Sequence, residues 1–120
     1  MTDERLTRLS RLMHKTDFER VLKQRRLQVT APPFLLLACP GQAVRLGIVV
    51  GKRFVARAVD RNLVKRLLRE SFRRWRGELP AVDLVVMLRQ RIQGLDRNKL
   101  RTQIEALWRG LVEKARLTAN

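Results

Sequence analysis

GKRFVARAVDRNLVKRLLRESFRRWR, residues 51–76, runs from a short strand end into a long helical pattern. Gly77 and Pro80 follow it, and glycine and then proline just past a helical run are typical of a helix C-terminus. On a wheel of about 100° per residue, one arc is almost entirely apolar. That arc holds Val59, Leu63, Val64, Leu67, Leu68, Ser71, Phe72 and Trp75. The sequence therefore predicts a helix over residues 58–76 with one face packed against a core.

The opposite arc of this predicted helix is basic and contains no carboxylate. It holds Arg61, Asn62, Lys65, Arg66, Arg69, Arg73 and Arg76. Like charges four residues apart destabilise a helix, and a solvated face normally mixes both signs. The row of cations at 61, 65, 69 and 73 therefore favours a face that phosphates neutralise, with a merely solvated face as the alternative. The planar guanidinium group of arginine favours nucleic acid over lipid as the partner. Because both residues lie on this basic face, we expect Lys65 and Arg69 to be exposed.

The charge of the whole chain points to the same class of partner. The formal net charge is +16, and residues 51–76 carry ten of the 27 lysines and arginines but only two of the 11 acids. Such a charge repels itself in a compact protein, so a polyanionic partner is expected. No apolar run approaches the roughly 18 residues of a spanning helix, and the N-terminal residues lack the apolar stretch of a signal peptide. We therefore expect a cytoplasmic protein without a membrane partner.

Other patterns around this helix complete a small fold of one domain, residues 1–120. Thr16 and Glu19 have the form of a capping box at the start of a short helix. Strands are predicted over 27–39, with an edge position or a bulge at Pro32-Pro33, over 46–50 and over 83–88. Asp96 is the predicted N-cap of a last amphipathic helix. The order αββαβα indicates an α+β fold, a small α-β sandwich.

The central run resembles the signature helix of the bacterial ribonuclease P protein subunit. In that family a basic pair at a strand end precedes a helix that begins Arg-Asn-Arg and continues with Lys-Arg and Arg-Glu. The corresponding residues here are Lys52-Arg53, Arg61-Asn62, Lys65-Arg66 and Arg69-Glu70, and Leu63 stands where the triplet has its last arginine. Residues 12–22, with the pair Asp17-Phe18, resemble the family's first helix, and residues 78–83 lead into a strand that resembles its third.

The resemblance implies a fold and a function. The family fold is an α-β sandwich with an unusual left-handed βαβ crossover, an exception to the right-handed rule. The family protein joins a large catalytic RNA and helps this endoribonuclease to remove the 5′ leader from precursor transfer RNA. The RNA supplies the active site, and the protein guides the single-stranded leader through a cleft between its first helix and the sheet. The implied partners are therefore the catalytic RNA subunit and precursor transfer RNA, with no obligate protein partner.

The resemblance also assigns candidate binding residues. Candidates for RNA contacts are Lys52, Arg53, Arg57, Arg61, Asn62, Lys65, Arg66, Arg69 and Arg73. Phe18, Leu22 and Phe34 are candidates for the leader cleft, where aromatic rings can stack on bases. Each can instead be an ordinary core residue, and for Phe34 we weigh the two interpretations equally. Because many relatives carry a second aromatic residue where this chain has Leu22, stacking at that helix would depend on Phe18.

No set of residues predicts a catalytic or metal site in the protein itself. His14 is the only histidine and has no partner at a metal-ligand spacing, and no carboxylates cluster as in a two-metal nuclease. Three classes of function remain: a subunit of a ribonucleoprotein enzyme, a non-catalytic RNA-binding module such as a ribosomal protein or RNA chaperone, and a self-sufficient nuclease. The ordered central motif favours the first. We expect Mg²⁺ to be held mainly by the RNA subunit and substrate, and the protein alone to be inactive.

Overall fold

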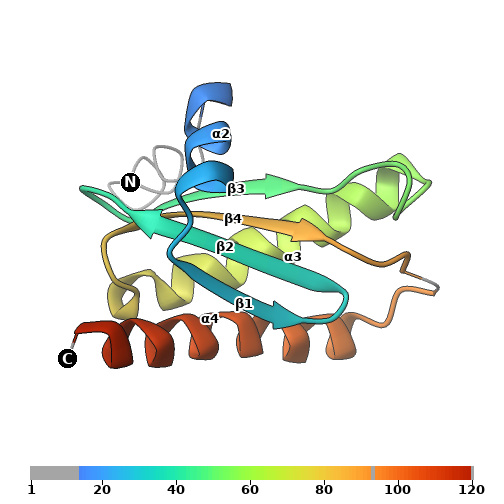
Figure 1. Cartoon of the computed structure of the whole chain (residues 1–120). Helices are drawn as coiled ribbons and strands as arrows, with labels where there is room; N and C mark the ends of the chain where they lie inside the picture. Colours follow the sequence, from blue (N-terminus) through green and yellow to red (C-terminus); the bar gives the residue numbers. More distant parts are fainter. Residues whose placement is uncertain (1–13, 93, 120) are drawn as a thin grey trace, which may run out of the picture.

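The computed structural model describes residues 14–92 and 94–119. Leu12, where the resemblance to the family's first helix starts, lies outside this range. Figure 1 shows one sheet with α2 on one face and two longer helices on the other. The elements in chain order are α2 (Lys15–Gln24), β1 (Leu27–Ala31), β2 (Phe34–Pro40), β3 (Arg45–Val49), α3 (Ala58–Trp75), the short 3₁₀ helix η1 (Arg76–Glu78), β4 (Val82–Leu88) and α4 (Arg97–Ala119).

The four strands lie in the order β1-β2-β4-β3. The pairs β1–β2 and β2–β4 are antiparallel, whereas β3 and β4 are parallel and are joined through α3. In Figure 1, β3 lies above β4, both strands run to the right, and α3 crosses behind the sheet. This arrangement makes the crossover left-handed, as the resemblance implies. The α+β class and the α-β sandwich are therefore confirmed.

The single strand predicted over residues 27–39 is wrong, because this stretch forms a hairpin. β1 and β2 pair antiparallel, and Ala31 lies opposite Phe34 across the turn made by Pro32 and Pro33. Neither proline can donate a hydrogen bond to a strand ladder, so two prolines between apolar runs end one strand and allow another to begin. The order is therefore αβββαβα rather than αββαβα.

One of the two N-cap residues predicted from the sequence is confirmed by the structure. Asp96 Oδ1 accepts a hydrogen bond of 3.2 Å from the Lys99 backbone N–H, which confirms Asp96 as the cap of α4. The predicted N-cap Thr16 is wrong. His14 is the N-cap of α2, and the Asp17 carboxylate accepts a hydrogen bond of 3.0 Å from the His14 backbone N–H. The capping-box geometry therefore exists, shifted toward the N-terminus by two residues.

The two central strands are buried on both faces. Side chains at even positions of β2 pack with α3 and α4 in the larger apolar cluster, and those at odd positions pack with α2 in a smaller one. The smaller cluster consists of Val21, Leu35, Leu37, Cys39 and Val85, with Phe18 and Met87 packed against it. The sheet thus separates a large core from a thin apolar layer under α2.

Polar contacts join α3 to α4 within the larger core. The Trp108 indole N–H donates to Ser71 Oγ at 2.8 Å, and the Trp75 indole N–H donates to Glu105 Oε2 at 3.1 Å. Ser71 Oγ also donates to Glu105 Oε2 at 3.3 Å. Trp108 is fully buried. These directional bonds fix the rotation of α3 about its axis and thus which of its faces meets solvent.

Helix α4 lies against β1 with Gly110 at a close approach. A Cβ added at Gly110 would lie 2.6 Å from Val29 Cγ1, a stiff and buried side chain. We expect Gly110→Ala to lower the free energy of unfolding, because overpacking costs about 1–3 kcal/mol and alanine's helix propensity returns only about 1 kcal/mol. Denaturant unfolding measures this, and the same substitution in a Val29→Ala background should be tolerated. A more stable Gly110→Ala protein in the native background would contradict the close approach.

Candidate nucleic-acid interface

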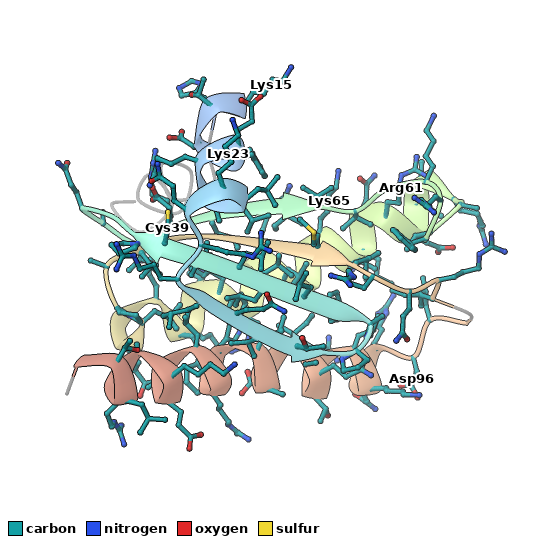
Figure 2. The ribbon with its side chains drawn as sticks, in the orientation of Figure 1. Lys15, Lys23, Cys39, Arg61, Lys65 and Asp96 are labelled. Atoms are coloured by element: carbon teal, nitrogen blue, oxygen red, sulfur yellow. The ribbon has the colours of Figure 1, made fainter. Side chains whose placement is uncertain are left out.

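Helix α3 presents the predicted basic face to solvent. Its inner face is buried through Val64, Leu67, Leu68, Ser71 and Phe72. Figure 2 shows Arg61 and Lys65 extending from α3 on the side of the view away from α4. The exposed RNA-binding candidates are Lys52, Arg53, Arg57, Asn62, Arg66 and Arg73, and the half-buried ones are Arg61, Lys65 and Arg69. The structure therefore places all nine on or beside one helix.

Burial and contacts differ along the row of cations at 61, 65, 69 and 73, which we call the α3 row. The expectation that Lys65 and Arg69 are exposed is wrong, because both are half-buried. Arg61 also donates to the carbonyl oxygens of Val55 and Ala56, at 3.1 and 2.7 Å, so its guanidinium holds the segment before α3. Arg73 is exposed, and neither it nor Lys65 has an ion-pair partner within the described part of the chain.

The two acids of α3 pair with cations beside the α3 row. Arg66 lies 3.8 Å from Glu70, and Arg57 lies 3.9 Å from Asp60. Three of the four partners are exposed and Asp60 is half-buried, and pairs at the surface contribute about 0–1 kcal/mol. Phosphate can therefore replace either carboxylate at small cost, so the pairs are compatible with RNA contacts at Arg57 and Arg66.

The basic pair before α3 lies in a tight turn after β3. The backbone N–H groups of Phe54 and Val55 both donate to the Gly51 carbonyl at 3.1 Å. Lys52 and Arg53 are exposed, and the Arg53 guanidinium carbon lies 5.3 Å from the centre of the Phe54 ring. The turn thus adds two exposed cations beside the N-terminal end of α3, in continuity with the helix face.

The leader-cleft candidates divide between the two faces of the sheet. Phe18 is half-buried against the smaller apolar cluster, and Leu22, on the same helix, is 39% exposed. Phe34 is 1% exposed and packs in the larger cluster under α3 and α4. Its assignment to a cleft between α2 and the sheet is therefore wrong, because alternation along β2 directs its ring through the opposite face. Phe34 is a core residue.

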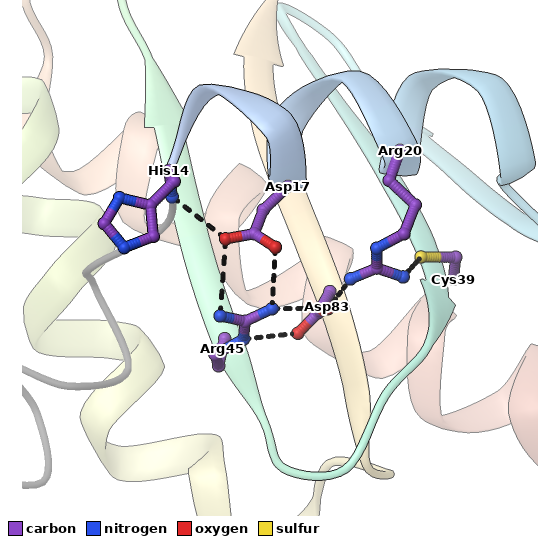
Figure 3. A network of polar contacts seen from close by, with 6 residues as sticks. All are labelled: His14, Asp17, Arg20, Cys39, Arg45 and Asp83. Atoms are coloured by element: carbon purple, nitrogen blue, oxygen red, sulfur yellow. Dashed lines mark hydrogen bonds and ion pairs between the residues drawn. The ribbon is translucent and has the colours of Figure 1, made fainter.

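A partly buried network of charged side chains joins α2 to the sheet (Figure 3). We call it the α2 network; it contains Asp17, Arg20, Cys39, Arg45 and Asp83. The Arg45 guanidinium donates twice to Asp83, at 2.8 Å each, and twice to Asp17, at 3.2 and 3.4 Å. Arg20 donates to Asp83 and, at 2.9 Å, to Cys39 Sγ. Two carboxylates thus neutralise two guanidinium groups.

The α2 network keeps its aspartates ionised. Burial by itself raises the pKa of Asp83, which is 2% exposed, but hydrogen bonds from Arg45 and Arg20 outweigh it and leave this pKa below its ordinary value. The backbone N–H of His14 and the guanidinium of Arg45 likewise lower the pKa of Asp17. The same hydrogen bonds to carboxylates raise the pKa of both arginines. The network is therefore charged throughout the neutral pH range.

The pairing of Arg45 with Asp83 was not predicted from the sequence. One feature of the sequence indicated that Arg45 has a buried partner. Arg45 is the only charged residue between residues 27 and 50. A single arginine among apolar strand residues needs a buried partner, since an unpaired guanidinium is costly inside a protein. The identity of that partner, 38 residues away, was not accessible from spacing alone.

Within the described ranges, no three histidine, cysteine or acidic side chains are grouped so as to hold a metal ion. His14, the only histidine, is exposed at the start of α2. In the same ranges, no helix has the length and apolar character needed to cross a bilayer. The surface that the described residues do offer is a strongly basic one, formed by α3 and the turn before it.

Comparisons with known proteins all point to one family. The sequence model of the family Ribonuclease P matches residues 6–112. The chain is 39% identical to the ribonuclease P protein component of Chromohalobacter salexigens, over 97% of this chain and 92% of the relative. The RNase P protein of Staphylococcus aureus has a similar structure, with a TM-score of 0.75, 28% identity and coverage of 83% and 93% of the two chains. For the RNase P protein of Thermotoga maritima the TM-score is 0.68, with 31% identity and coverage of 86% and 96%.

Proposed function

Because this chain belongs to the bacterial ribonuclease P protein family, we propose that it binds the catalytic RNA of that enzyme and the 5′ leader of precursor transfer RNA. In this proposal the protein promotes removal of the leader, so that the mature 5′ end of transfer RNA is formed. The α3 row carries the proposal, because its four cations, three half-buried and one exposed, lie together on the side of the helix opposite its buried face. The basic turn at Lys52 and Arg53 extends the same surface.

The chemistry of cleavage is assigned to the RNA. The described residues do not fit a protein-held magnesium site, since no suitable group of ligands occurs among them. Mg²⁺ would therefore be held mainly by the RNA subunit and the substrate. The protein's own contribution is to bind phosphates and to position the single-stranded leader. The proposal needs no obligate protein partner and places the complex in the cytoplasm.

The RNA that the protein retains during purification tests the assignment. Under gentle lysis and low salt, we expect a structured RNA of several hundred nucleotides, with precursor transfer RNA, to be enriched over total RNA. Sequencing of the bound RNA gives the answer directly. Enrichment of ribosomal RNA in its place would overturn the proposal in favour of a non-catalytic RNA-binding module. A charge-matched fragment of random RNA serves as the competitor, because non-specific binding follows phosphate content alone.

Phe18 is expected to contribute to leader binding more than to folding. Its ring is half-buried at the edge of the smaller cluster, which leaves part of it free to stack on a base. Phe18→Ala in the assembled enzyme should weaken binding of leader-bearing substrate by about 1–3 kcal/mol, the scale of one lost base stack. Binding of mature transfer RNA, which lacks the leader, should be nearly unchanged.

Equilibrium binding of both ligands, together with thermal unfolding, checks this expectation. Leu117→Ala is a suitable control, because Leu117 is an apolar side chain on α4 that is 70% exposed. It should change neither affinity. Equal losses of affinity for both ligands in Phe18→Ala, with a large fall in Tm, would show that Phe18 acts only as a core residue.

A further inference from the structure

Helix α2 has little besides the α2 network to hold it on the sheet. It has ten residues, of which only Val21 is fully buried. Among the described elements it is the one helix on this face of the sheet, since α3 and α4 pack on the other side (Figure 1). A short helix with so small an apolar anchor is marginal by itself, so its position depends on additional contacts.

The α2 network supplies these contacts from one row of the sheet. Cys39 and Arg45 lie on either side of Asp83 in the strand register, so three strands contribute neighbouring side chains. From α2, Arg20 reaches Asp83 and Cys39, and Asp17 receives Arg45 (Figure 3). Asp17 and Arg20 are three residues apart and therefore share one side of the helix. Two separate sets of contacts, which we call the two arms, thus connect α2 to paired strands of the sheet. One arm joins Asp17 to Arg45, and the other joins Arg20 to Asp83 and Cys39.

These arms lie on either side of Phe18 in the sequence. Because Asp17 precedes Phe18 directly and Arg20 follows two residues later, a rotation or shift of α2 would move the ring with them. The network is also electrically neutral, with two carboxylates for two guanidinium groups, and its central carboxylate is buried. It is therefore unsuited to binding phosphate itself, and its directional bonds are suited to positioning.

We propose that Asp17 and Arg20 are positioning residues, which fix α2 on the sheet through Arg45 and Asp83 and so hold Phe18 where a leader base can stack on it. This inference rests on the proposed function and adds residues that touch neither RNA nor substrate. It predicts that cutting the two arms alters recognition of the leader, while the phosphate contacts of α3 remain intact.

The test is the double substitution Asp17→Asn with Arg20→Gln, assembled with the catalytic RNA. It removes one negative and one positive charge, so the net charge and the general attraction to RNA are unchanged. The amide oxygen introduced by Asp17→Asn can still accept the hydrogen bond from the His14 N–H, and the Arg45–Asp83 pair remains inside the sheet. The fold is therefore preserved, which thermal unfolding verifies. Asp17→Asn alone, which removes the negative charge and one of the two oxygens that accept from Arg45, is the milder second variant.

The readout is the ratio of the Kd for leaderless substrate to the Kd for leader-bearing substrate. We expect the double substitution to lower this ratio about fivefold or more, since a whole base stack is worth about 5- to 150-fold. Affinity for the leaderless substrate should stay unchanged. Adding Phe18→Ala to the double variant should cause little further loss, because a misplaced ring no longer stacks.

A matched control is Glu113→Gln with Arg116→Gln, which removes the same two charges from exposed positions on α4. It should leave the ratio unchanged. An unchanged ratio in the folded Asp17/Arg20 variant would overturn the positioning role, as would equal loss for both substrates. If the unaltered enzyme showed no preference for the leader, the proposed function would fail instead, so the two failures are distinguishable.

Discussion

Protein freed of nucleic acid should leave precursor transfer RNA uncut, even at high Mg²⁺ concentration. The described residues contain no grouped ligands for paired metal ions, and their one histidine is exposed at a helix start without an acidic partner for general-base work. Addition of the catalytic RNA should restore cleavage at the mature 5′ end. The expected difference is therefore between no detectable product and efficient turnover.

Electrophoresis of end-labelled precursor measures this difference. The protein is stripped of RNA by high salt and nuclease treatment, and the nuclease is then removed. A heat-inactivated sample and the catalytic RNA alone are the necessary controls. Robust metal-dependent cleavage by the RNA-free protein would contradict the assignment and support a self-sufficient nuclease.

The double substitution Lys65→Ala with Arg73→Ala should weaken binding to the catalytic RNA and make it less sensitive to salt. Each lost phosphate contact reduces the slope of log affinity against log salt by about 0.7–0.9, so two should reduce it by about 1.4–1.8. Affinity itself should fall by about 1.5–3 kcal/mol for each charged contact. Because Lys65 and Arg73 have no ion-pair partner in the described structure, stability should hold.

The matched control is Arg74→Ala with Arg109→Ala. Arg74 on α3 and Arg109 on α4 each lie 3.9 Å from Glu105. Their removal changes the net charge by the same amount as the removal of Lys65 and Arg73. A salt series with both variants distinguishes a specific surface from a general charge effect. Equal slopes for the two variants would mean that RNA responds only to net charge, and a native slope in the Lys65/Arg73 variant would place the RNA elsewhere.

The basic face of α3 was predictable because one helix contains both its buried and its exposed side chains. Helical periodicity then assigns each residue to a side without knowledge of the rest of the fold. The faces of β2 were not predictable in the same way. Residues 34–39 read FLLLAC, with no alternation of polar and apolar residues, because the strand is buried on both sides. Adjacent residues of a strand point to opposite faces, but the sequence could not tell which of Phe34 and Leu35 faces α2 and which faces α3 and α4.

Polar pairs between residues far apart in the chain are a second feature that could not be predicted from the sequence. The hydrogen bonds between Arg45 and Asp83 join residues 38 apart, and those between Arg20 and Asp83 join residues 63 apart. No local pattern encodes such distances, and only the strand order β2-β4-β3 brings the partners together. The family resemblance likewise assigned candidate RNA-binding residues to α3 but gave no information about the network under α2.

The buried inner face of α3 has a consequence for the thermodynamics of RNA binding. Ordering a backbone segment costs about 1–2 kcal/mol per residue, so an 18-residue basic helix that folded only on RNA would forfeit much of its binding energy. Here α3 is already folded, because its inner face packs in the core. Only the ends of the long cationic side chains remain to be immobilised, at about 0.5–1.5 kcal/mol each. The cations thus form a preorganised array, about 6 Å apart along the helix axis, and the proposed binding of RNA phosphates to it requires no coupled folding.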